Sequence, residues 1–138
     1  MSTSAAKNVN RLLWTAQTLI ALLFLFAGST KFIMSAQQLQ QGPGSVFPIP
    51  FIHFIGICEC LGALGLILPG LLRIRPVLTP LAAAGLTIIM IGATIVSIPM
   101  GAGSAFPAVV GVITAWISYA RTRVSPLADA PRRVFRAA

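Results

Sequence analysis

The sequence predicts an all-α integral membrane protein, a four-helix bundle with both termini in the cytoplasm. Three observations lead to this prediction. Apolar residues make up 57% of the 138 residues and charged residues only 9%, with a mean hydropathy of +0.91. Residues 12–30 and 76–120 contain no charge, and about 20 apolar residues are enough to span the hydrocarbon core of a bilayer. Lys and Arg lie between or outside these stretches, as membrane topology requires.

A single membrane domain of residues 1–138 is expected, and its spans cover about residues 12–33, 51–72, 78–98 and 105–120. The first apolar run resembles that of a signal peptide, but it exceeds the usual length of about 7 to 15 residues. We therefore expect a retained span. The segments "LPGLLRIRP" and "PMGAGSAFP" predict short breaks between helices. The long connection, residues 35–50, predicts an interfacial turn or a short helix with an extended tail.

The positive charges predict the orientation. Of the ten Lys and Arg residues, only Lys31 falls on the side away from the termini in a four-span layout. Cytoplasmic segments carry the excess of Lys and Arg, so this side is predicted to be periplasmic. The basic tail, residues 121–138, is expected to be a cytoplasmic segment that contacts anionic membrane lipid rather than nucleic acid. The sequence does not indicate the oligomeric state.

Each predicted span has one bulky apolar face and one face of small or polar residues. In the second span, Leu61 and residues at helical spacing from it form the bulky face, and Glu59 points about 160° away from Leu61. The small or polar faces comprise Gln17, Ala21, Phe24, Gly28 and Lys31; Gly56, Glu59, Ala63 and Gly70; Ala83, Thr87, Met90, Thr94 and Ser97; and Pro107, Gly111, Thr114 and Ser118. These faces are expected to converge on one interior, where the hydroxyl groups serve packing or ligand contact.

Glu59 is the candidate central residue of a polar interior site. It and Asp129 are the two acids of the chain, and an ionisable group inside the membrane is costly and usually functional. Glu59 is expected about 12 Å and Lys31 about 4 Å below the outer ends of their spans. Because Cα–Cβ bonds tilt toward the helix N-terminus, the two side chains lean toward each other. In the competing picture, Lys31 extends to the head groups and a protonated Glu59 donates to Thr94 or Thr114.

Three further residues in the second span are candidates for chemistry. Cys58 and Cys60 lie about 200° apart on a helix, too far around it for a disulfide, so we expect them to pack as small apolar side chains. His53, near the outer end, is a candidate proton donor to a quinone-like head group or an interfacial histidine bound to water. The spacing of these residues predicts no metal site.

The segments "LFLFAGSTKF" and "ECLGALGLILPGL" resemble the DoxX-like family of small four-span bacterial membrane proteins. The resemblance implies a multi-pass bundle in the bacterial inner (cytoplasmic) membrane. Lys31 and Glu59 fall on the family pattern, whereas His53, Cys58 and Cys60 do not. Some members are similar to subunits of thiosulfate–quinone oxidoreductases or to partners of redox-stress proteins.

Three functional classes therefore remain open. The resemblance favours an accessory or redox-linked subunit that binds a quinone-like molecule or a partner enzyme through Glu59. A small membrane enzyme, an isomerase or oxidoreductase subunit with Glu59 as its acid–base group, is the alternative. A proton-coupled exporter fits less well, because small dual-topology exporters need a weak charge bias.

Overall fold

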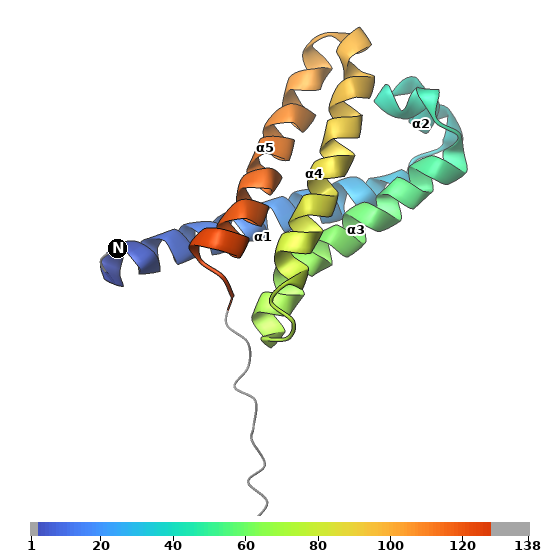
Figure 1. Ribbon diagram of the computed structural model, residues 1–138. Coiled ribbons are helices and arrows are strands. Elements are labelled where there is room, and N and C mark those ends of the chain that lie inside the picture. The colour runs from blue at the N-terminus through green and yellow to red at the C-terminus, as the bar shows by residue number, and fades with distance from the viewer. Residues whose placement is uncertain (1–2, 128–138) are drawn as a thin grey trace, which may run out of the picture.

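The computed structural model describes residues 3–127, and this part of the chain is built from helices joined by short connections (Figure 1). The four long helices are α1 (Thr3–Ile33), α3 (Ile49–Leu72), α4 (Leu78–Ser97) and α5 (Ala105–Tyr119). The short ones are α2 (Ala36–Gln41), η1 (Pro43–Val46), η2 (Ile98–Met100), η3 (Ala102–Ser104) and the π-helical segment η4 (Ala120–Val124). The prediction of an all-α membrane fold is confirmed.

Three of the described helices are long and apolar enough to cross a membrane, as judged by length and composition: Ser4–Ile33, α3 and α4. Helix α5 has 15 residues and is about 22 Å long, shorter than a hydrocarbon core of about 30 Å. A π-helical turn, η4, continues it directly. The fourth span therefore stays a prediction. Helix α1 begins well before the predicted span, because no Gly or Pro interrupts its first turns.

The long helices pack in chain order, α1 against α3, α3 against α4 and α4 against α5, and α5 also contacts α1 (Figure 1). Their antiparallel course creates two ends. The "Arg121 end" contains Asn10–Gln17 of α1, the last turns of α3, the first turn of α4 and η4. The "Lys31 end" contains the last turns of α1, the first turns of α3, and α2 and η1. The end of α5 thus returns to the first half of α1, where Arg121 donates to Gln17.

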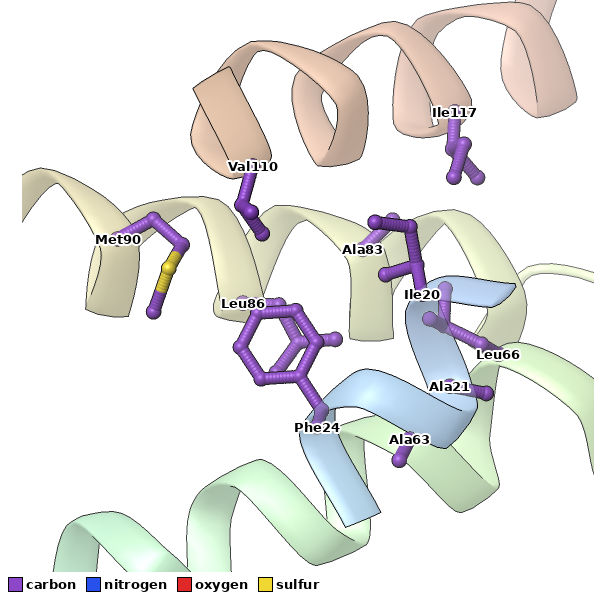
Figure 2. Packing of buried hydrophobic residues seen from close by; sticks show 10 residues of the cluster. All are labelled: Ile20, Ala21, Phe24, Ala63, Leu66, Ala83, Leu86, Met90, Val110 and Ile117. Atoms are coloured by element: carbon purple, nitrogen blue, oxygen red, sulfur yellow. The ribbon is translucent and has the colours of Figure 1, made fainter. Parts of the chain in front are cut away.

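The predicted faces of the helices are confirmed. The bulky face of α3 is open, with Leu61 63% exposed, whereas Glu59 is 3% exposed. The opposite faces meet in one apolar core, to which every long helix contributes (Figure 2). Its buried members are Ile20, Ala21, Phe24, Ala63, Leu66, Ala83, Leu86, Met90, Val110 and Ile117. The bulky side chains outside therefore suit contact with lipid, as expected for a membrane protein.

The connections follow local rules. Between α3 and α4 the backbone takes positive φ at Arg73 (53°) and Arg75 (41°), which makes the predicted tight turn. Ser35 caps α2 through a capping box with Gln38. After α2, η1 lies against α2 and α4, and the chain is extended at Phe47 and Pro48 before α3 begins. The predicted short helix is therefore present in the 35–50 connection, whereas the expected extended tail is interrupted by η1.

Candidate functional site

The site at the Lys31 end depends on a close approach of α1 and α3. A Cβ atom on Gly28 would lie 2.8 Å from the backbone oxygen of Gly56 and 2.6 Å from the Sγ atom of Cys60. These distances are too short for any side chain, so glycine at position 28 allows the two backbones to approach. Lys31 follows Gly28 by one helical turn, and Glu59 follows Gly56 by one turn on the antiparallel helix. The glycines thus bring the two ionisable residues within reach of each other.

Lys31 and Glu59 form an ion pair. The Nζ atom of Lys31 lies 2.5 Å from Oε2 of Glu59 and 3.2 Å from the backbone oxygen of Ala27. The side chain of Glu59 is 4% exposed and that of Lys31 is 23% exposed. Lys31 therefore leans inward, as the tilt of its Cα–Cβ bond predicts, instead of extending to the head groups. The functional roles of both residues remain predictions.

A pocket of about 490 Å³ lies next to this ion pair, between the first half of α3 and the second half of α4. Lys31 and Glu59 form the charged part of its wall, and η1 closes one side of it through Gly44. The rest is apolar and partly aromatic: Phe47, Phe51, Ile52, Phe54, Ile55, Cys58, Ile88, Ile89, Gly92, Ala93 and Val96. Such a mostly apolar pocket with few polar groups is typical of sites for small molecules.

Lys31 has one N–H without a partner among the described residues, and this N–H can bind a ligand. Its ammonium group has three donors, of which two are directed at Glu59 and Ala27. Among the described residues, it has no further hydrogen-bond partner. A carbonyl or hydroxyl oxygen in the pocket could accept this third hydrogen bond, while Glu59 holds the ammonium group in place.

The structure does not bring Thr94 and Thr114 to Glu59. Thr94 donates to the backbone oxygen of Met90 on its own helix. Thr114 is fully buried between α4 and α5, where it donates to Gly111 and accepts a hydrogen bond from Thr87. The competing picture, in which Glu59 donates to one of these hydroxyl groups, is therefore not what the structure shows. Thr114 thus links α5 to α4, whereas the hydroxyl group of Thr94 bonds within α4.

His53 lies near the ion pair but does not line the pocket. Its ring stacks on that of Phe32, with centroids 5.3 Å apart and an interplanar angle of 17°. Cys58 lines the pocket, Cys60 packs against Gly28, and both are free thiols. In the described part of the chain, no group of three or more His, Cys, Asp and Glu residues could hold a metal ion.

Sequence reasoning missed a second polar cluster, at the Arg121 end. Arg121 was expected in an exposed tail, but its side chain is 3% exposed and donates to Gln17 and Asn10. Gln17, itself fully buried, donates to the backbone oxygen of Leu66 at 2.6 Å. The sequence contains a pattern that indicates this burial. Arg121 continues the three- and four-residue spacing of Thr114 and Ser118 on the inner face of α5.

The fold and the Lys31 site define a multi-pass helical membrane protein with a buried ion pair beside an apolar pocket. The family model of the DoxX-like family matches residues 15–118. The chain therefore belongs to the DoxX-like family. No curated protein and no solved structure matches the chain.

Proposed function

We propose that this DoxX-like protein binds a lipophilic molecule with a polar, quinone-like head group in the pocket next to Lys31 and Glu59. It would act as an accessory or redox-linked subunit beside a partner enzyme. One observation carries the proposal: the ion pair forms the charged wall of a pocket of about 490 Å³ that is otherwise apolar. A head group with ring carbonyls matches both parts of this wall.

The fit is chemical as well as spatial. The aromatic rings of Phe47 and Phe51 lie with centroids 5.0 Å apart at the pocket, and they offer contacts to a flat ring. The third N–H of Lys31 can donate to a ring carbonyl. The hydrocarbon tail of such a ligand would leave toward the lipid between α3 and α4, whose outer faces are exposed and apolar.

A second candidate is a small membrane enzyme that uses Glu59 as its acid–base group. It is favoured by the hydrogen bond between the carboxylate of Glu59 and the ammonium group of Lys31, because such a pair can exchange a proton with a bound substrate. The two proposals differ in one measurable property. Only the enzyme would show turnover when purified alone.

The proposed orientation places both termini in the cytoplasm of a bacterium and the pocket in the periplasmic half of the inner membrane. The distribution of Lys and Arg supports it. An impermeant thiol reagent should label a cysteine introduced at Gln40 in intact spheroplasts, and should not label one introduced at Asp129. The two native cysteines are replaced by alanine for this experiment. The reverse labelling pattern would show the opposite orientation.

The binding proposal is tested with protein reconstituted in nanodiscs. Mass spectrometry of the extracted lipids should identify a co-purified quinone, and a short-chain quinone analogue should raise the melting temperature. Glu59→Gln should keep the fold and lose this binding, because the amide cannot hold the ammonium group by charge. Thr94→Val, at a hydroxyl outside the pocket, should bind like the wild type. Quinone binding that survives in Glu59→Gln would contradict the proposal.

A further inference from the structure

The guanidinium group of Arg121 is buried among neutral partners. Its Nε atom donates to Gln17 at 2.6 Å, and its Nη1 atom donates to Asn10 at 2.8 Å and to the backbone oxygen of Ser125 at 3.2 Å. Its centre lies 5.5 Å from the centroid of the Trp14 ring. The Nη2 atom is buried and has no hydrogen-bond partner among the described residues. The group is therefore held in place but has two N–H donors left over.

The charge of Arg121 also lacks a counter-charge within the described residues. The one acid among them, Glu59, is paired with Lys31 at the opposite end of the bundle. Burial lowers the pKa of Arg121, because removal from water disfavours the charged form. Arginine nevertheless stays protonated at physiological pH. A buried charge of this kind is costly unless an opposite charge and further hydrogen bonds accompany it.

Arg121 forms part of the wall of a pocket of about 360 Å³. The turn before α4 and the residues after η4 complete this wall: Pro76, Val77, Pro80, Leu81, Ser118, Thr122, Pro126 and Leu127. The hydroxyl groups of Ser118 and Thr122 donate to the backbone oxygens of Pro80 and Ser118. Their protons are engaged, so the donors without a described partner are those on Nη2 of Arg121, which are shielded from solvent and reach the pocket after a small turn of the guanidinium group. The pocket thus suits an anion that accepts hydrogen bonds.

The position of this pocket matches that of lipid head groups. Arg121 comes directly after the last turn of α5, close to the exposed Tyr119 and above the ring of Trp14. Trp and Tyr side chains concentrate at the level where lipid head groups meet the hydrocarbon core. A phosphate group at this level is therefore available from the bilayer itself.

We propose that Arg121 is the anchor of a binding site for one phosphate group in the pocket at the Arg121 end. The planar guanidinium group offers its free N–H donors to phosphate oxygens in the geometry that arginine favours. The phosphate would supply the counter-charge that the described residues lack. The head group of an anionic phospholipid and free inorganic phosphate share this chemistry, and the experiment distinguishes between them.

The experiment uses the full chain in nanodiscs of phosphatidylcholine, with and without phosphatidylglycerol. The melting temperature and the lipids retained in native mass spectrometry are recorded. Arg121→Gln is compared with Arg123→Gln, a matched control that removes an equal charge from an exposed position of η4. For the wild type and Arg123→Gln, phosphatidylglycerol should raise the melting temperature, and one molecule should be retained. Arg121→Gln should bind it about tenfold or more weakly, since a hydrogen-bonded charge pair is lost.

A second arm adds inorganic phosphate to wild-type protein in phosphatidylcholine alone, with chloride at equal ionic strength as the control. Stabilisation by phosphate without retention of phosphatidylglycerol would assign the site to free phosphate. Stabilisation by phosphatidylglycerol alone would assign it to the lipid. If neither stabilises the wild type, the proposal is overturned, and this result does not depend on whether Arg121→Gln folds.

Two other outcomes would also overturn the proposal of a phosphate site at Arg121. The first is equal retention of phosphatidylglycerol by the wild type and Arg121→Gln, which would show only general attraction to a basic surface. The second involves Asp129, which lies outside the described residues. If Asp129→Asn lowers the melting temperature as much as Arg121→Gln does, and the lipid has no effect, the counter-charge comes from the chain itself.

Discussion

The two ends of the bundle each hold a buried or half-buried cation, but they stabilise it in different ways. At the Lys31 end, the ammonium group contacts the carboxylate of Glu59 directly. At the Arg121 end, the guanidinium group is more deeply buried, and its described partners are two side-chain amides, one backbone oxygen and an aromatic ring. The first charge is balanced within the protein. Among the described residues, the second has unpaired N–H donors and no counter-charge, so the comparison predicts different responses to mutation and to lipid.

This difference also predicts which kind of ligand each end can bind. A neutralised ion pair beside an apolar pocket of about 490 Å³ can orient an uncharged polar head group without repelling it. A buried cation without a carboxylate attracts an anion instead. The two ends are therefore expected to bind ligands of different charge.

The largest effect is expected from reversing one charge of the ion pair. Lys31→Glu places two carboxylates together and should lower the free energy of unfolding by about 2–4 kcal/mol, less than for a fully buried pair because Lys31 is partly exposed. The double variant Lys31→Glu with Glu59→Lys should recover much of this loss. The free energies of unfolding of the single and the double variant are measured by titration with a denaturing detergent.

Lys7→Glu is the matched control for this prediction, because Lys7 is exposed on the same helix. It should change the free energy of unfolding by less than about 0.5 kcal/mol. A double variant no more stable than the less stable single variant would show that the ion pair contributes nothing to the fold.

The next largest effect is expected at the helix contact that brings Lys31 and Glu59 together. Gly28→Ala forces the α1 and α3 backbones apart, because its Cβ would lie 2.8 Å from the Gly56 oxygen. We expect a loss of about 1–3 kcal/mol in unfolding free energy and weaker quinone-analogue binding. In Gly85→Ala, the new methyl group meets nothing within 4 Å, so a gain of about 0.5–1 kcal/mol is expected. Equal effects of the two substitutions would contradict this account.

A smaller change at the Arg121 end sharpens the comparison. Gln17→Glu would place a carboxylate against Nε of Arg121 but lose the hydrogen bond to Leu66, so stability should change by only about 1 kcal/mol. Its informative effect is on lipid dependence. Because the variant carries its own counter-charge, phosphatidylglycerol should raise its melting temperature less than that of the wild type. An unchanged lipid dependence would mean that the missing charge is not what the lipid supplies.

The smallest effects are expected for the cysteines. Cys60→Ala removes a thiol packed against Gly28, and Cys58→Ala removes one from the pocket wall. Each should cost less than about 1 kcal/mol in unfolding free energy and leave quinone-analogue binding intact, as checked by melting temperature with and without the analogue. Loss of binding in a folded Cys58→Ala variant would reveal thiol chemistry that packing does not require.

Much of the Lys31 site could be predicted from the sequence, because its determinants are local and periodic. The spacing of Leu61 and its neighbours at three and four residues assigns Glu59 to the inner face of α3. The rise per residue and the tilt of the Cα–Cβ bonds predict that Lys31 can reach it if the inner faces of the two helices meet. Both rules concern one helix at a time, so they hold whatever the helices pack against.

Only the tertiary structure decided which inner faces meet and how closely. The approach of α1 and α3 depends on Gly28 lying opposite Gly56, a register that no single helix encodes. The contacts of Arg121 with Gln17 and Asn10 join residues separated by 104 and 111 positions. Thr94 and Thr114 lie on inner faces as predicted, but Thr94 donates within α4, and Thr114 donates within α5 and accepts from Thr87 of α4. Periodicity determines the direction of a side chain around its helix, whereas its partner depends on the distance and register between helices.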